Sequence, residues 1–327
     1  MAKKTFEAQL EALDGLQKEP VAAWAEPLRT ALRHRSNYVV AKAADLAGRQ
    51  RLEELMPDLL AAFDRFFNDA VKSDPQCWAK NALSRTLAAL ELQDSAPFLR
   101  GLCHVQMEGT WGGRSDTAGT LRGTCALALV QCRDLPEPEL LRHLLPLLVD
   151  ADKTVRGNAV RAIEQVGSPA ASLLLRLRAE MAQAPGIARD EPEVLGACYG
   201  GVLRIDGGSA VQWAAKFLAT EDDAGGEAAL AIAALHSPEG FAVLKDRWGS
   251  ASDPWFSSVL LSAIALTRQS EATEFLVDIV RREAMRADQA VEALVRSLPS
   301  EDILLRLKSL IAGNARLERI YAESQRR

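Results

Sequence analysis

Apolar positions recur along this chain at the spacing of one buried helix face, and small residues occupy many of them. The clearest stretch is DKTVRGNAVRAIEQVG, residues 152–167. Its apolar residues fall at i, i+4, i+7, i+8 and i+11, which is the stripe that one helix presents to its neighbours. They are Val155, Ala159, Ala162, Ile163 and Val166. The pattern predicts a helix packed against others along one side.

The same small and aliphatic pattern returns at positions 30 to 42 residues apart, namely at Ala44, Leu83, Cys125, Ala159, Cys198, Leu230, Leu260 and Ala290. Amphipathic partner helices are predicted between these anchors, at residues 54–69, 96–107, 138–149, 170–181, 210–218, 238–248, 271–285 and 301–311. Turns rich in Asp, Ser, Gly or Pro follow them, as at Ser252-Asp253-Pro254, where the Asp suits a helix N-cap and the Pro suits the first helical turn.

Repeated helix pairs that cannot bury their apolar faces alone stack into a continuous array. The predicted fold is therefore all-α: an α-solenoid of about eight stacked antiparallel helix pairs, in a single domain of residues 1–327. Residues 1–19 are predicted to form an N-terminal cap helix, residues 20–311 the repeats, and residues 312–327 a C-terminal cap or tail. Aromatic residues make up only 6% of the chain, and essentially no sheet is expected.

The motif D-x-x-V-R-x-x-A-x-x-A-I resembles the HEAT-repeat family, and especially the short HEAT-like repeats of bacteria. The resemblance implies that Asp152 caps the second helix of its pair and that Arg156 reaches a neighbouring repeat, with Arg122 and Lys80 as counterparts of Arg156. In later repeats the position of Arg156 is occupied by Leu195, Glu227 and Ser257. A continuous ladder of Asp and Arg along the whole chain is therefore not expected.

Net charge, cysteine content and hydropathy exclude several classes of protein. The net charge is −5, so the chain as a whole has no electrostatic bias toward nucleic acid or anionic membranes. The five cysteines form no CxxC pair, which fits neither a disulfide framework nor a zinc site, and Cys125 and Cys132 are expected to be small core residues. No apolar stretch is long enough to cross a membrane, and no secretory signal precedes the repeats. We expect a soluble, cytoplasmic protein.

Catalytic and cofactor motifs are missing from the sequence. The four histidines include no His-Glu dipeptide, which argues against the HEAT-fold hydroxylases that hold a di-iron centre with such pairs. There is no GxxxxGK[ST] phosphate loop and no GxSxG nucleophile elbow. We therefore expect no catalytic residues, no cofactor and no metal site.

The longest interval between anchors, from Leu83 to Cys125, contains an extra loop at about residues 108–117. It carries Trp111 among glycines, with the charged residues Glu108, Arg114 and Asp116. Two interpretations are open. The loop is a binding element, because insertions in repeat proteins collect on one face and an exposed Trp beside Arg suits an interface, or Trp111 tucks back and plugs an imperfect junction between repeats.

A second candidate surface is the side of the second helices opposite the buried stripe. It includes Asn158, Arg161 and Gln165, with Arg204 at an equivalent place in the next repeat. This strip also has an ordinary interpretation as a solvated helix face. In HEAT-like arrays it lines the concave surface.

The function predicted from the sequence is a non-catalytic scaffold or adaptor that binds a partner protein or peptide along this surface. The first alternative is a HEAT-like DNA-binding protein or a glycosylase for alkylated bases, for which several Trp, Asp and Arg residues are of suitable type. The second alternative is a protein like the HEAT-like lyases that attach bilin pigments. Nucleic acid thus stays open as a less favoured partner, and no membrane partner is expected.

Overall fold

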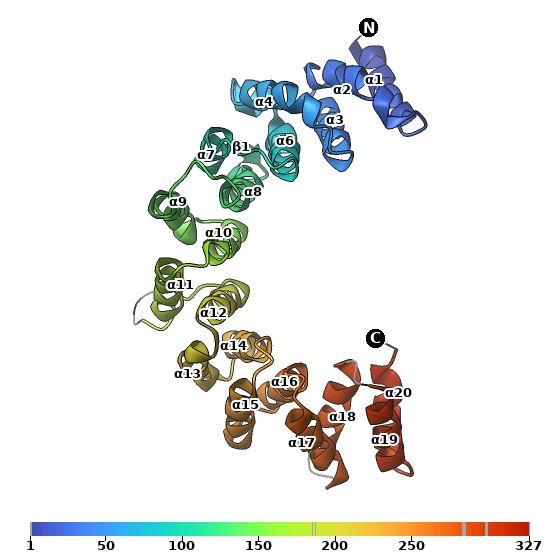
Figure 1. Ribbon diagram of the computed structural model, residues 1–327, viewed down its shortest axis with the longest axis vertical. Helices are drawn as coiled ribbons and strands as arrows, with labels where there is room; N and C mark the ends of the chain where they lie inside the picture. Colours follow the sequence, from blue (N-terminus) through green and yellow to red (C-terminus); the bar gives the residue numbers. More distant parts are fainter. Residues whose placement is uncertain (1, 185, 187, 283–285, 298–299, 327) are drawn as a thin grey trace. The chain divides into compact units, whose positions relative to one another are not determined.

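A computed structural model describes residues 2–184, 186, 188–282, 286–297 and 300–326. The described chain is predominantly helical (Figure 1). It divides into two compact units, Met1–Val166 and Gly167–Arg327. The all-α class predicted from the sequence is confirmed at this level. The predicted end of one partner helix at Met285, and the chain ends Met1 and Arg327, lie outside the described residues.

The first unit has these elements in chain order: α1 (Ala2–Leu16), η1 (Val21–Ala23), α2 (Ala25–Leu32), α3 (Asn37–Arg49), η2 (Glu53–Leu55), α4 (Met56–Arg65), α5 (Ala70–Ser73), η3 (Pro75–Cys77), α6 (Trp78–Ala89), α7 (Ala96–Leu102), β1 (Met107–Thr110), β2 (Gly113–Asp116), α8 (Gly119–Leu129), α9 (Glu137–Leu144), η4 (Leu145–Val149) and α10 (Lys153–Val166). In this unit α3 packs on α6, α6 on α8 and α8 on α10. The helices α2, α4, α7 and α9 each pack on the helix that follows in its pair.

The second unit continues with α11 (Pro169–Met181), α12 (Pro192–Asp206), η5 (Gly207–Ala210), α13 (Val211–Ala215), η6 (Lys216–Thr220), α14 (Asp223–Ala233), α15 (Pro238–Ser250), α16 (Pro254–Leu266), α17 (Ser270–Arg281), α18 (Ala287–Arg296), α19 (Glu301–Ile311) and α20 (Ala315–Ser324). Here α12 packs on α14, α14 on α16, α16 on α18 and α18 on α20. Each unit therefore repeats the same contact between the second helices of successive pairs.

The predicted anchors form the core of these contacts with one exception. Ala44, Leu83, Cys125, Ala159, Cys198, Leu260 and Ala290 are all fully buried, whereas Leu230 is 40% exposed. In α14 the buried position is Ala229 instead, so the predicted register was wrong by one residue there. Because α14 is rich in glycine and alanine, its sequence does not show clearly which positions form the buried face.

Side-chain caps begin several helices where the sequence predicted turns. The Asp253 carboxylate accepts a hydrogen bond from Phe256 N at 2.8 Å, and Asp222 accepts one from Gly225 N at 3.0 Å. Ser168 and Ser237 act in the same way, each directly before a proline in the first helical turn. These bonds satisfy N–H groups that the helix itself leaves unpaired.

One expectation needs correction. The chain does contain a small sheet, because β1 and β2 pair as an antiparallel hairpin in the segment predicted to be a loop.

The segment predicted to be a C-terminal cap or tail, residues 312–327, contains helix α20, which buries Leu317 and Tyr321 and packs on α18.

Candidate functional site

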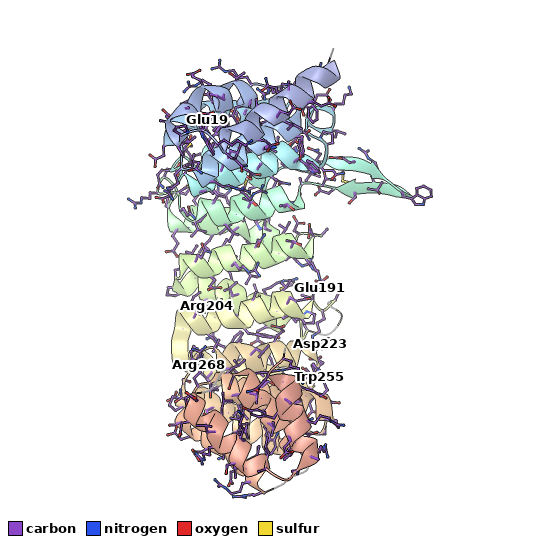
Figure 2. All side chains as sticks on the ribbon, turned by 90° about the vertical axis from the view of Figure 1, so that its right-hand side faces the viewer. Glu19, Glu191, Arg204, Asp223, Trp255 and Arg268 are labelled. Carbon is purple, nitrogen blue, oxygen red and sulfur yellow. The ribbon has the colours of Figure 1, made fainter. Side chains whose placement is uncertain are left out.

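The most distinctive surface feature is the hairpin β1–β2, which projects from the helices of the first unit (Figure 2). Thr110 pairs with Gly113, so only Trp111 and Gly112 form the turn. Gly112 has a φ of 90°, the left-handed value that the third position of a type II turn requires and that glycine adopts without strain. Trp111 is fully exposed to solvent. Trp111 therefore covers no junction between repeats, and the plug interpretation is wrong.

The base of the hairpin is fixed to the helical body through Glu108. Its Oε1 accepts hydrogen bonds from Gln76 N at 2.6 Å, Gln106 Nε2 at 2.6 Å and Thr117 Oγ1 at 2.8 Å. Burial raises the pKa of Glu108, but these hydrogen bonds outweigh it and hold the pKa below its ordinary value. Because Gln76 belongs to η3, this carboxylate joins the hairpin to the start of α6.

Asp116 fixes the other strand of the hairpin. Its Oδ1 accepts from Gln106 N at 2.9 Å and from Ala118 N at 3.0 Å, and its Oδ2 lies 2.6 Å from Arg122 Nη1. Burial raises the pKa of Asp116, while these donors together lower it below its ordinary value. Arg122 also pairs with Asp150 through Nε at 2.8 Å and Nη2 at 3.1 Å. The hairpin is thus connected to α8 and to the turn before α10.

A buried polar network that the sequence did not reveal lies beneath the hairpin. Gln106 is 2% exposed, and its Nε2 donates to the carbonyl of Asp74 at 2.8 Å. The fully buried Asp74 carboxylate pairs with Lys80 Nζ at 3.0 Å and caps α6 by accepting from Ala79 N and Lys80 N. The turn Ser73-Asp74-Pro75 has the residue types that predict a helix cap, but nothing in the sequence indicated that Gln106 would bond to it.

The four residues predicted in the loop therefore divide into two kinds. Glu108 and Asp116 are half-buried and use their carboxylates in the hydrogen bonds that fix the hairpin to the helices. Trp111 and Arg114 are exposed, and Arg114 Nη2 donates to Met107 O across the hairpin at 3.0 Å. The exposed part of the hairpin is its tip, which carries an indole with a guanidinium behind it.

The residues predicted on the helix faces are distributed over both units. On α10, Arg161 and Gln165 are exposed, and Arg161 Nη1 donates to Asn158 Oδ1 at 3.2 Å. Asn158 is half-buried against α8, where Gly123 leaves room for its amide. Arg204 is exposed on α12 in the second unit (Figure 2).

The residues of the repeat motif make contacts on both sides of their helices. Arg122 does reach the next turn, through its pair with Asp150. Arg156 Nη1 donates to the carbonyls of Asp150 and Ala151, and Lys80 pairs with Asp74; both of these contacts stay within the turn that precedes the same helix. The Asp152 carboxylate accepts from Thr154 N at 2.8 Å and also lies over Gly119 of α8.

No group of three His, Cys, Asp or Glu side chains within the described residues is placed to hold a metal ion. None of the described helices combines the length and the apolar character that crossing a bilayer requires. A comparison with protein-family models gives no match for this chain, and a comparison with curated proteins gives none.

Proposed function

We propose that this chain is a non-catalytic protein-interaction module whose β1–β2 hairpin presents Trp111 to a partner protein. The observation that carries the proposal is the complete exposure of Trp111 at the tip of a hairpin whose base is fixed by the hydrogen bonds of Glu108 and Asp116. We further propose that the helix pairs belong to a HEAT-like α-solenoid in the cytoplasm, whose second helices offer additional binding residues, such as Arg161 in the first unit and Arg204 in the second.

Two contributions to the free energy of binding favour the hairpin tip as a contact site for a partner. An exposed indole is a large apolar surface that gains free energy when a partner removes it from water, and Trp is enriched among residues that dominate binding energy. Two strands joined by a two-residue turn leave the tip little conformational freedom to lose on binding, and the contacts of Glu108 and Asp116 hold the base in place. A flexible loop would lose more entropy for the same contact.

The test is affinity capture from native cell extract with the wild type and with Trp111→Ala, at low and moderate salt. We expect a stoichiometric partner to be retained by the wild type at both salt concentrations. Its affinity should fall by about 30-fold or more in the variant, the effect of losing about 2 kcal/mol from a central contact. The melting temperature should stay nearly unchanged, because the indole makes no packing contribution.

Val149→Ala is the matched control, since Val149 is another exposed apolar residue of the first unit, at 68% exposure, and lies outside the hairpin. It should bind as the wild type does. Equal recovery of the partner by Trp111→Ala would contradict the proposal. Recovery of nucleic acid that is lost on adding salt would favour the DNA-binding alternative.

A further inference from the structure

A groove of about 470 Å³ lies in the first unit between the end of α1 and the helices α3 and α6. Its volume falls within the range of about 300 to 1,000 Å³ typical of sites for small ligands. It shares no residue with the hairpin. Its polar and aromatic lining comprises two aromatic rings, three cationic side chains, two amides and one carboxylate, which are Tyr38, Trp78, Lys42, Arg49, Arg85, Gln17, Asn81 and Asp45.

The aromatic part of the groove is preformed. Tyr38 and Trp78 are 42% and 48% exposed, and their ring centroids lie 5.7 Å apart. Trp78 Nε1 donates to Gln76 Oε1 at 3.3 Å, which helps to hold the indole in place. Two adjoining rings with half of their surface open provide a platform for an apolar side chain.

The amide of Asn81 provides the polar recognition. Its Oδ1 is buried and has no hydrogen-bond donor among the described residues. A buried acceptor without a partner destabilises the fold, so a ligand N–H that reaches it removes this cost. An Asn amide has an acceptor and a donor side by side, which match the N–H and C=O of a peptide backbone.

The charges of the groove specify one negative group on the ligand. Lys42 Nζ lies 2.6 Å from Asp14, and Arg85 Nη2 lies 3.2 Å from Asp45, so both of these cations are neutralised. Arg49 is exposed and has no hydrogen-bond or ion-pair partner in the described part of the chain. A guanidinium in this state is suited to bind a carboxylate through two parallel hydrogen bonds.

We infer that the groove binds an extended peptide of a partner protein that carries an acidic side chain close to an apolar one. The apolar side chain packs on Tyr38 and Trp78, the peptide backbone pairs with Asn81, and the Asp or Glu side chain pairs with Arg49. A nucleic-acid strand fits less well, because successive phosphates require several unpaired cations and the groove offers one.

The experiment is selection of a phage-displayed random peptide library on the immobilised full chain, beside parallel selections on Trp78→Ala and Arg49→Gln. We expect the wild type to enrich peptides with Asp or Glu within three positions of an aliphatic or aromatic residue. A synthetic peptide of the most enriched sequence, measured by fluorescence anisotropy, should bind either variant at least about tenfold more weakly.

Asn81→Leu separates binding from folding. It replaces the unpaired acceptor with an apolar group of similar shape, so the melting temperature should be unchanged or higher while peptide binding falls at least about tenfold. Arg142→Gln removes an exposed arginine from α9, outside the groove, and should bind as the wild type does. Trp111→Ala should also bind the peptide normally, which distinguishes failure of this inference from failure of the proposed function.

Three results would overturn the inference: no enrichment of such peptides by the wild type relative to Trp78→Ala, equal affinity of the selected peptide for Arg49→Gln, or its displacement by a single-stranded oligonucleotide at moderate salt.

Discussion

At the scale of single residues, the buried pair of Asp74 and Lys80 is the most sensitive point of the first unit. Both side chains are fully buried, and the carboxylate also accepts from Asn37 Nδ2 at 3.0 Å. Removing one member leaves the other charge buried without its counter-ion. We expect Asp74→Ala to lower the free energy of unfolding by about 3 to 5 kcal/mol, measured by urea denaturation.

The double variant Asp74→Asn with Lys80→Met is the control for this prediction. It removes both charges while the Asn oxygen remains able to cap α6, so most of the lost stability should return. If the double variant were as unstable as Asp74→Ala, the loss would come from the cap or from packing rather than from the stranded charge.

The ionisation of Glu221 should make the stability of the second unit depend on pH. Hydrogen bonds from Arg247, Ser252 and Asp253 lower its pKa from 4.5 to about 2. A pKa lowered by folding stabilises the native state above the unfolded value, and this contribution disappears as the pH falls from about 4.5 to about 2. The stability difference between wild type and Glu221→Gln should therefore be largest near neutral pH and should shrink over this window. A difference that stays constant from pH 7 to pH 2 would contradict this account.

The sequence identified the individual residues of the hairpin but not all of their roles. Trp111 stood out because a large aromatic between glycines is unusual in a repeat turn. Glu108 and Asp116 looked equally exposed, because their partners Gln76, Gln106 and Arg122 become neighbours only when the hairpin folds back on η3 and α8. Local sequence does not carry that information.

At the scale of elements, small residues set how closely the helices approach. A Cβ added to Gly101 of α7 would lie 2.4 Å from Cys125 Sγ of α8, whereas one added to Gly157 of α10 meets nothing within 4 Å. Gly101→Ala should therefore cost about 1 to 3 kcal/mol through overpacking. Gly157→Ala should stabilise the chain by about 0.5 to 1 kcal/mol, because alanine favours a helix interior. Urea denaturation measures both.

Combining Gly101→Ala with Cys125→Ala removes the sulfur atom that the new methyl group meets. Part of the lost stability should return in this variant. If Gly101→Ala alone had the same free energy of unfolding as the wild type, α7 would be able to shift away from α8 without loss of stability.

The residue types of the hairpin explain why the sequence predicted a loop at this place. Its strands have four residues each, and of β1 and β2 only Thr110 is β-branched. The pairing depends instead on Glu108 and Asp116 at the base and on Gly112 in the turn. None of these features produces the alternation of apolar and polar residues by which strands are recognised.

At the scale of the whole molecule, the recurring apolar pattern predicted a helical fold, because an amphipathic helix must bury its apolar face against another element. Seven of the eight anchors named from the sequence are buried, and the exception, Leu230, lies in a helix crowded with Gly and Ala. The division into Met1–Val166 and Gly167–Arg327 was not predicted. The motif continues across that boundary without a change in composition that would mark it.

We propose that the tip of the hairpin contacts a partner protein. Replacing Trp111 with a photo-crosslinking phenylalanine analogue and irradiating in native extract tests it most directly, with the same analogue at the exposed Val149 as the control. The account predicts one dominant protein adduct from position 111 that is absent from position 149 and persists at moderate salt. Identical adducts from both positions, or none from position 111 under conditions in which the wild type retains its partner, would contradict it.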